Sequence, residues 1–371
     1  MQKKQKRASH KPEWASGGKS EGFTTQVMDG IKDNTKKSKS KKNIKTKKIT
    51  TDDFVIGVLE DNRTVLAQAI TLIESNSVKH IEKAQELLGK ILHKTGKSIR
   101  IGITGAPGVG KSTFIESFGT YLCDNGHKVA VLAIDPSSSR SRGSILGDKT
   151  RMENLSRNPN AFIRPSPSGG TLGGVTRKTR ESIMLCEAAG FDVIIVETIG
   201  VGQSEITVRS MVDFYLLLIL PGGGDELQGL KKGAVELADA VAINKADGDN
   251  IKSAYLTKEQ YKQAVHYLLP ATEGWETQVF TCSGLTDQGI EQLWNMIIEF
   301  EKKTKKLGVF ELRRKEQTLD WVYAMVEESL KNRFYGNSKV EKKRIEIDKK
   351  LLDGKITPTI AVNELMKMYF E

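Results

Sequence analysis

Short apolar runs alternate with amphipathic segments through the middle of the chain. Two of the runs, 193–196 and 214–220, are apolar at every position, which is typical of parallel strands covered by helices on both faces. The pattern therefore predicts an α/β fold with a mainly parallel, doubly wound sheet. The predicted strands are 99–104, 129–134, 161–164, 193–196, 214–220, 240–243 and 278–281.

Both flanks of this region are predicted to be helical. Apolar positions recur at helical spacing before the first strand, and charged helical patterns run from about Lys303 to Phe370. The last part carries an apolar stripe that either packs on the chain's own core or buries surface against another subunit. The stripe consists of Leu319, Val322, Met325, Val326 and Leu330. The predicted parts are a tail (1–50), an N-terminal helical extension (51–97), an α/β domain (98–303) and a C-terminal helical arm (304–371).

The basic charge of the chain lies in its first 50 residues. They hold 15 Lys and Arg against 4 Asp and Glu, whereas the other 321 residues hold 42 of each sign. The basic balance therefore belongs to a tail and not to a domain face, so nucleic acid is not an expected partner of the folded part. We interpret the tail as a disordered, solvated extension, and a nucleic acid-binding tail is the alternative.

Three cysteines, Cys123, Cys186 and Cys282, lie far apart, which argues against a disulfide framework or a thiolate metal site. No apolar run reaches the roughly 18 residues that a membrane-spanning helix needs, and the N-terminus lacks the apolar core of a secretory signal. These features predict a cytoplasmic protein with no membrane partner. The mitochondrial matrix is the alternative location, although the tail favours Lys over Arg and contains acidic residues.

The strongest chemical signal follows the first predicted strand. The sequence there fits G-x-x-x-x-G-K-[ST] between a strand and a helix, the context of a phosphate-binding loop (P-loop). Backbone N–H groups of such a loop point at phosphate oxygens, Lys111 neutralises β/γ charge and Ser112 can ligate Mg²⁺. A chance glycine turn is the alternative. The predicted nucleotide-binding residues are Gly105, Ala106, Pro107, Gly108, Val109, Gly110, Lys111, Ser112 and Thr113.

A second polar element, Asn-Lys-Ala-Asp, ends the strand 240–243 and contributes Asn244, Lys245 and Asp247. The Asp247 carboxylate can accept from N1–H and the exocyclic amine of guanine, while Asn244 can meet the O6/N7 edge. Adenine offers neither donor in that arrangement, so the motif predicts a preference for GTP of a few kcal/mol. Taken alone, the motif reads equally as a polar turn in which Asp caps a helix.

Between these motifs, the strand at 193–196 is followed by Glu197 and then by Gly200. A carboxylate at the end of a buried strand fits the Walker-B acid beside Mg²⁺, and the Gly200 N–H can sense a γ-phosphate. The order of P-loop, acidic strand end and NKxD is the signature of a GTPase. The predicted reaction is hydrolysis of GTP to GDP and phosphate.

Three longer stretches resemble the MeaB/ArgK-type GTPases, a P-loop GTPase family associated with methylmalonyl-CoA mutase. They are IDPSSSRSRGSILGDKTRM at 134–152, ETIGVGQSE at 197–205 and GDELQGLKKG at 224–233. The resemblance spans about 52–370 and implies a P-loop GTPase core with an N-terminal helical extension and a C-terminal arm that forms a homodimer. It also implies a G-protein chaperone that binds the adenosylcobalamin-dependent mutase, gates cofactor loading and protects or reactivates the mutase.

The resemblance also assigns roles to residues. Asp135 and Asp148 match acidic first-switch positions near Mg²⁺ and the γ-phosphate, and Lys231 falls in a third switch at 222–233. Taken alone, Asp135 reads as an Asp-Pro turn, Asp148 as a helix N-cap and 222–233 as a glycine-rich loop. The resemblance implies Ser112, Asp135, Asp148 and Glu197 as Mg²⁺ ligands. The implied catalytic residues are Lys111, Asp135, Asp148, Glu197 and Lys231.

The chain departs from the family pattern in two places. The guanine-side loop, Ser283, Gly284 and Leu285, carries Gly284 where such loops usually have Ala, which gives the loop more freedom. Val201 follows Gly200 where many switch GTPases carry a water-orienting Gln. We therefore expect slow intrinsic hydrolysis that the mutase accelerates.

Two related functions are alternatives. A metallochaperone GTPase for nickel enzymes shares the core, but the five His and three Cys show no clustered ligand spacing. A kinase or ATPase linked to a lysine/arginine/ornithine transport system needs a phosphoryl acceptor, and the sequence shows no constellation that would activate one.

Overall fold

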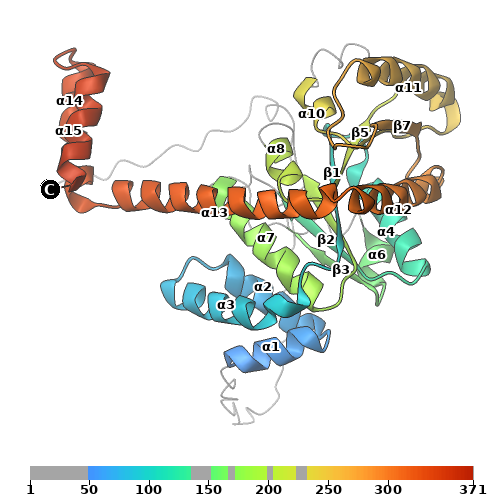
Figure 1. The fold of residues 1–371 in the computed structure, drawn as a ribbon, viewed down its shortest axis with the longest axis horizontal. Coiled ribbons are helices and arrows are strands. Elements are labelled where there is room, and N and C mark those ends of the chain that lie inside the picture. The colour runs from blue at the N-terminus through green and yellow to red at the C-terminus, as the bar shows by residue number, and fades with distance from the viewer. Residues whose placement is uncertain (1–48, 135–151, 166–171, 199–203, 223–231, 371) are drawn as a thin grey trace, which may run out of the picture. The chain divides into compact units, whose positions relative to one another are not determined.

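A seven-stranded sheet forms the centre of the protein. The computed structural model describes residues 49–134, 152–165, 172–198, 204–222 and 232–370. All neighbouring strands in the sheet are parallel, in the order β3-β2-β4-β1-β5-β6-β7 (Figure 1). This arrangement confirms the predicted α/β class. The strands are β1 Ile99–Gly105, β2 Val129–Ile134, β3 Ala161–Arg164, β4 Val193–Thr198, β5 Phe214–Ile219, β6 Ala240–Ile243 and β7 Gln278–Thr281.

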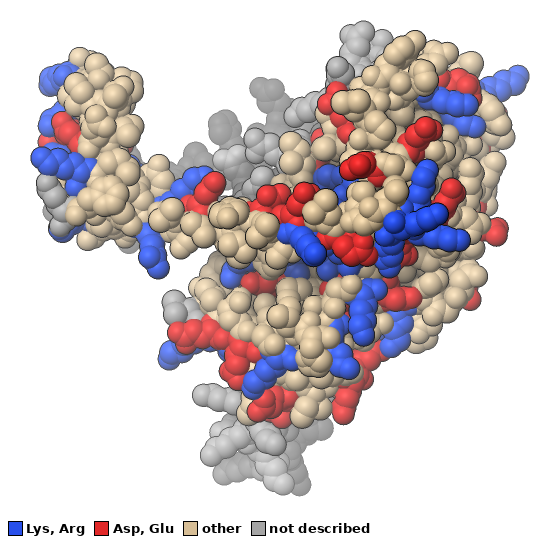
Figure 2. Space-filling view, viewed as in Figure 1, with Lys and Arg blue, Asp and Glu red and all other residues tan. Residues whose placement is uncertain are grey.

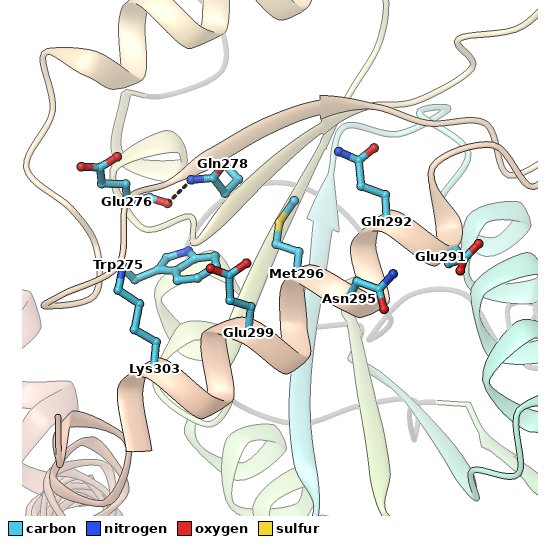
Figure 3. A pocket seen from close by; sticks show the side chains of 9 residues that line it. All are labelled: Trp275, Glu276, Gln278, Glu291, Gln292, Asn295, Met296, Glu299 and Lys303. Atoms are coloured by element: carbon cyan, nitrogen blue, oxygen red, sulfur yellow. Dashed lines mark hydrogen bonds between the residues drawn. The ribbon is translucent and has the colours of Figure 1, made fainter. Parts of the chain in front are cut away.

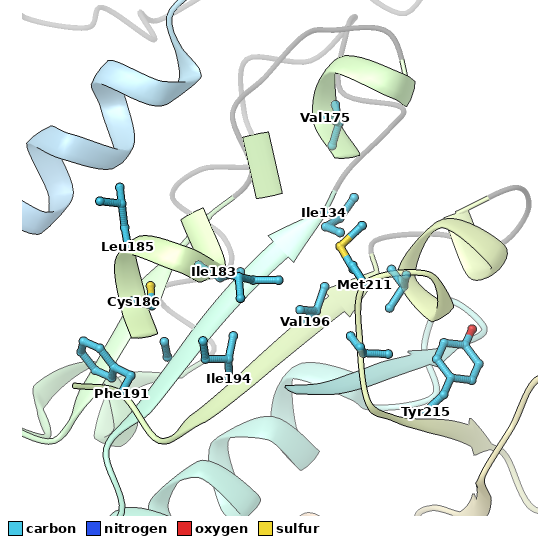
Figure 4. Packing of buried hydrophobic residues seen from close by; sticks show 14 of the residues in the cluster. Ile134, Val175, Ile183, Leu185, Cys186, Phe191, Ile194, Val196, Met211 and Tyr215 are labelled. Atoms are coloured by element: carbon cyan, nitrogen blue, oxygen red, sulfur yellow. The ribbon is translucent and has the colours of Figure 1, made fainter. Parts of the chain in front are cut away.

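Helices cover both faces of the sheet, as the apolar character of the strands requires. Alternate strand residues point to opposite faces, so Ile194 and Val196 join one core while Val193 and Ile195 join the other. Figure 4 shows the first core, where Ile183 on α7 lies near the β4 side chains. Both β4 and β5 are buried at every position, because each lies inside the sheet between two helical layers.

The first core is covered by α7 and α8, by the N-terminal helices α1–α3, and by α10 and α11. The second is covered mainly by α4, α6 and α12. The helices up to α12 are α1 Thr51–Leu59, α2 Arg63–Glu74, α3 Val78–Ile91, α4 Lys111–Asp124, α6 Glu153–Arg157, α7 Leu172–Ala188, α8 Ser204–Arg209, α10 Lys232–Glu236, α11 Ile251–His266 and α12 Ile290–Lys306. Short 3₁₀ turns span Leu92–Lys94 and Gly248–Asn250.

The N-terminal helices start at clear local signals. Thr50 and Asp53 form a capping box at α1, and the Asn62 side chain accepts from two backbone N–H groups of α2. The apolar face of α2 is buried, and Gln85 on α3 donates to Glu181 on α7 at 2.9 Å. The predicted helical region before the first strand is therefore confirmed, and it packs on the first core.

The C-terminal region is helical as predicted, and it comprises α13 Val309–Tyr335, α14 Ser338–Leu352 and α15 Pro358–Phe370. Figure 1 shows α14 and α15 side by side at the carboxyl end of α13, in agreement with their mutual contacts. Most of the predicted apolar stripe of α13 does not pack on the chain's own core. Leu319, Val322, Val326 and Leu330 are all exposed, and only Met325 is partly buried.

The surface agrees with the balanced charge count of the residues that follow the tail. Figure 2 shows acidic and basic side chains interspersed on the face in view, with basic groups gathered where α12 meets α13. The last turn of α12 supplies Lys303, Lys305 and Lys306, which suit the negative end of that helix dipole. Among the helices that the structure describes, none is long and apolar enough to cross a membrane.

Candidate nucleotide-binding site

The P-loop connects the end of β1 to the start of α4, and its glycines are required by the local geometry. Gly108 and Gly110 have φ values of 81° and 93°, in the left-handed region that favours glycine. A Cβ on Gly110 would also lie 2.9 Å from Nδ2 of Asn244, and one on Gly105 would lie 2.6 Å from the Leu218 carbonyl oxygen. The backbone conformation of the loop therefore requires glycine at these positions.

Lys111 is the first residue of α4, and its side chain folds back over the loop. Its Nζ donates to the carbonyl oxygens of Gly105 and Ala106 at 2.7 and 3.2 Å. Partial burial lowers the pKa of the Lys111 ammonium, and the charge of Glu197 opposes that change. The ammonium is thus held above the bend of the loop, on the path that a bound phosphate chain takes in this motif.

Ser112 and Glu197 lie next to each other at the carboxyl edge of the sheet. The parallel register pairs Ile103 with Glu197, which brings the end of β4 to the base of the P-loop. The Ser112 hydroxyl lies 3.5 Å from Oε1 of Glu197, and Glu197 is only 4% exposed. A hydroxyl and a carboxylate are the hard oxygen donors that Mg²⁺ prefers, so the two residues present fit this ion.

Further ligands for such an ion are not visible in the described structure. Among the described residues, no group of three or more His, Cys, Asp and Glu gathers as a metal site. Asp135, Asp148 and Lys231 lie outside the described residues, as do Gly200 and Val201. The structure therefore brings together two of the four residues that were expected to bind Mg²⁺, Ser112 and Glu197, and the Mg²⁺ roles of all four stay predictions.

The NKAD motif is hydrogen-bonded directly to the P-loop. Asn244 is 2% exposed, and its Nδ2 donates to the Val109 carbonyl at 2.8 Å. Lys245 Nζ donates to the Gly108 carbonyl at 2.9 Å. Two motifs that are far apart in the sequence thus form one continuous structure at the carboxyl ends of β1 and β6.

The loop after β7 completes this structure. Oδ1 of Asn244 accepts from the Gly284 N–H at 3.3 Å, and the Ser283 hydroxyl donates to the Asp247 carboxylate. The same Ser283 oxygen accepts from the N–H groups of Leu285 and Thr286, both at 3.2 Å. Asn244, Asp247 and residues 283–285 are therefore gathered in one place. Both ends of the buried Asn244 amide bond to the protein, at Val109 and Gly284, so in this structure Asn244 joins the two loops instead of presenting its amide to the O6/N7 edge of a base.

Gly284 has a steric role that the sequence does not reveal. A Cβ at this position would lie 2.8 Å from Cα of Phe114 and 2.9 Å from its backbone N, and such distances are not found for real Cβ atoms. The loop therefore packs against the backbone of the first turn of α4. The glycine at 284 has a packing reason, whereas the sequence suggested only a gain in conformational freedom.

Two threonines at the strand ends were missed by sequence reasoning. The hydroxyls of Thr104 on β1 and Thr198 on β4 are fully buried and lie 2.8 Å apart. Their hydrogen bond ties together the two strand ends that carry the P-loop and Glu197. The sequence shows only that a threonine follows shortly after each of these apolar runs, and this does not indicate that the two hydroxyls meet.

A hollow of about 700 Å³ lies between β7 and α12, away from these motifs (Figure 3). Its walls include Trp275, Glu276 and Gln278 before and at the start of β7, and Glu299 and Lys303 on α12. It includes no residue of the P-loop, the NKAD motif or the 283–285 loop. The hollow is thus separate from the candidate nucleotide site.

Comparison with known proteins identifies the family. The chain matches the family model described as "Methylmalonyl Co-A mutase-associated GTPase MeaB" over residues 66–339. It is 47% identical to GTPase ArgK of Escherichia coli over 75% of this chain and 84% of ArgK. It is 43% identical to the mitochondrial methylmalonic aciduria type A homolog of Mus musculus over 86% of this chain and 79% of the mouse protein.

One solved structure extends this similarity to the fold. A crystal structure of an LAO/AO transport system kinase matches with a TM-score of 0.71 at 35% identity, over 88% of this chain and 99% of that chain. The sequence, the fold and the joined motifs thus agree. The chain belongs to the MeaB family of methylmalonyl-CoA mutase-associated GTPases.

Proposed function

We propose that the protein is a GTP-hydrolysing G-protein chaperone of an adenosylcobalamin-dependent acyl-CoA mutase of the methylmalonyl-CoA mutase type. In this role it gates cofactor loading and protects or reactivates the mutase. The observation that carries the nucleotide part is the hydrogen bond from Asn244 Nδ2 to the Val109 carbonyl, which joins the base-recognition motif to the phosphate loop. Membership of a mutase-associated family supports the choice of client.

The guanine base binds between the NKAD motif and the 283–285 loop. Asp247 accepts from the two donors on the Watson–Crick edge of guanine, and Ser283 orients that carboxylate through its hydroxyl. The Gly284 and Leu285 N–H groups, which donate to Asn244 and Ser283 in the structure, would lie on the O6 side of the base. An adenine in the same place would leave the carboxylate without its donors, which is the basis of selectivity.

The phosphates bind over the P-loop and the first turn of α4. Lys111 exchanges its two carbonyl partners for β- and γ-phosphate oxygens, because a charged acceptor forms the stronger hydrogen bond. Bound Mg²⁺ neutralises the charge that develops on the phosphates. Ser112 and Glu197 would hold this ion, together with Asp135 and Asp148, which are assigned by resemblance.

Hydrolysis is proposed to be slow in the isolated protein. Val201 occupies the position where many switch GTPases carry a water-orienting Gln. The third switch, with Lys231, and the first-switch acids would complete the catalytic arrangement when the mutase binds. Lys231 is therefore a proposed catalytic residue together with Lys111, Asp135, Asp148 and Glu197.

We also propose that the protein is cytoplasmic and that it forms a homodimer through its C-terminal arm. The tail is proposed to be a solvated extension. The exposed stripe of α13 supports the subunit contact, because four apolar side chains on one helix gain stability when another surface covers them. Light scattering at micromolar concentration tests the assembly, and a monomer would contradict it. The variant Leu319→Lys/Val326→Lys is expected to be monomeric with unchanged GTP affinity.

Purified mutase with adenosylcobalamin tests the client assignment. The GTPase rate is expected to rise when the mutase is added, and cofactor transfer is expected to differ between GTP and GDP. A GTPase rate that is the same with and without the mutase would contradict the chaperone role. Transfer of the γ-phosphate to a transport-system binding protein would instead support the kinase function named for the similar solved structure.

A further inference from the structure

The turn that follows α8 is held by side chains from two other helices. Arg180 on α7 donates from Nη2 to the carbonyl and hydroxyl oxygens of Ser210, at 2.5 and 3.0 Å. Gln317 on α13 donates from Nε2 to the carbonyls of Val212 and Arg209, at 2.9 and 3.3 Å. Arg209 is the last residue of α8, whose final carbonyls lack donor partners within the helix, and Ser210 and Val212 lie in the turn that follows. The end of α8 is therefore bound to both α7 and α13.

The same turn anchors the start of α13 through ion pairs. Arg314 donates to both carboxylate oxygens of Asp213, at 2.7 and 2.6 Å, and Arg313 donates to the Asp213 carbonyl at 2.9 Å. Asp213 is almost fully buried and also accepts from the Arg100 N–H at 2.8 Å. A displacement at the end of α8 must therefore move α13 or break several buried bonds.

Three polar atoms at this junction have unmet hydrogen-bonding capacity. Nε of Arg180, Oε1 of Gln317 and Nε1 of Trp321 are buried and have no hydrogen-bond partner among the described residues. The Arg180 guanidinium lies 5.5 Å from the centre of the Trp321 ring. A buried polar group without a hydrogen-bond partner is destabilising, so the present packing of α13 on α7 leaves a cost that another arrangement of these side chains could reduce.

Arg180 is the charged residue of the three. It is 9% exposed, and its hydrogen bonds to Gln317 and Ser210 go to carbonyl and hydroxyl oxygens rather than to a carboxylate. Burial lowers the pKa of the guanidinium to about 10, so it remains charged at neutral pH. The direct hydrogen-bond acceptors of this buried charge are all neutral, so a rearrangement that brought a carboxylate into contact with it would be favourable.

There is room at the junction for such a rearrangement. A hollow of about 270 Å³ lies between α7, α8 and α13, and its walls include Ile206, Ser210, Trp321 and Met325. The hollow is mainly apolar, and Ile206 on α8 is 68% exposed beside it. A shift of α8 can therefore bury Ile206 against Trp321 and Met325 while it changes the partners of Arg180 and Gln317.

From these contacts we infer that Arg180, Gln317 and Trp321 are positioning residues that couple α8 to the arm helix α13. The inference rests on the proposed GTPase function, because α8 follows Glu197 along the chain and so comes after the strand that meets the γ-phosphate and Mg²⁺. When α8 shifts with the nucleotide state, these three side chains move with it and change how α13 packs against α7 and α8. The exposed stripe of α13 is then presented differently in the GTP and GDP states.

Hydrogen exchange of the full-length protein tests this coupling. Backbone amides of α8 (204–209) and α13 (309–335) are compared in complexes with GDP and with a non-hydrolysable GTP analogue. The expected result is a joint change in both helices, of about tenfold in exchange rate, which corresponds to typical coupling free energies. The positioning role predicts that Gln317→Leu abolishes the change in α13 and preserves the change in α8.

Two further variants make the test specific. Trp321→Phe keeps an aromatic ring but removes the unmet donor, so it favours the present packing and reduces the α13 response at least threefold. Thr318→Ala is the matched control, because Thr318 is an exposed neighbour whose hydroxyl donates to the Arg314 carbonyl of its own helix. It should leave both responses unchanged.

The outcomes separate the two proposals. Equal exchange of α13 in the two complexes of the wild-type protein would overturn the coupling while leaving GTP binding intact. A full α13 response in Gln317→Leu would overturn the role of the three side chains. Failure of calorimetry to detect either nucleotide would overturn the proposed function together with this inference.

Discussion

Gly284→Ala tests whether the loop after β7 truly packs against the backbone of α4. Loops of this type usually carry Ala, so motif reasoning predicts a neutral or favourable change. The structure predicts the opposite, because the added Cβ would lie 2.8 Å from Cα and 2.9 Å from N of Phe114. Both atoms belong to a helix backbone that cannot rotate aside as a flexible side chain does, so the loop itself must move.

The size of the effect follows from this contact. Overpacking of a close-packed interior costs about 1–3 kcal/mol, and each kcal/mol lowers Tm by roughly 2–4 °C in a domain of about 150–250 residues. Displacement of the loop also weakens the hydrogen bond from the Gly284 N–H to Asn244. Loss of about 1 kcal/mol there would weaken GTP binding roughly fivefold.

Thermal unfolding and calorimetric titration of GTP measure the two effects. Gly89→Ala is the matched control, because Gly89 lies within α3 and a Cβ there meets no atom within 4 Å. That change should stabilise the protein by about 0.5–1 kcal/mol, since Ala favours a helix interior over Gly. If Gly284→Ala were as stable as the wild type and bound GTP equally well, the close packing of the loop on α4 would be refuted.

Three further predictions concern the site and its support. Asp247→Asn should reduce the preference for GTP over ATP by about tenfold or more, because the carboxylate that accepts two guanine donors is lost; competition with labelled GTP measures it, and an unchanged preference would contradict the pocket assignment. GTP affinity should fall as pH rises through the lowered pKa of Lys111, since the phosphates require its protonated form. Titrations upward from about pH 7 should show this fall beginning below the range of an ordinary lysine, whereas Lys111→Arg, which stays charged, should lack this early part of the fall and show only the loss that follows ionisation of guanine N1–H at higher pH. Asp213→Asn should lower stability by about 3–5 kcal/mol, because it leaves the partly buried Arg314 without its carboxylate; chemical denaturation measures the loss, and a change below about 1 kcal/mol would argue against the buried network.

Much of the fold was predictable because the strands bury both faces. The continuous apolar run of β5 and the shorter run of β4 identify central parallel strands without ambiguity. The P-loop and the NKAD motif were predictable as well, since each requires fixed residue types at fixed spacing. Their order along the chain and the parallel topology place both at the same edge of the sheet.

Close packing and hydrogen bonds between residues that are far apart in the sequence were not predictable. Nothing in the sequence shows that Gly284 touches the α4 backbone, because Phe114 is distant along the chain and contributes backbone atoms. The network around Asp213 likewise joins β1, the turn after α8 and α13 through residues with no local pattern. The apolar stripe of α13 was recognised from its spacing, but only the structure shows that it lies outside the chain's own core.

Calorimetric titration of the wild-type protein with Mg·GTP and Mg·ATP is the most direct test of the central claim, that the joined P-loop and NKAD motif bind a guanine nucleotide. The Asp247 carboxylate, oriented by Ser283, predicts binding of GTP about a hundredfold or more tighter than that of ATP, a difference of a few kcal/mol. Equal affinity for the two nucleotides would contradict it.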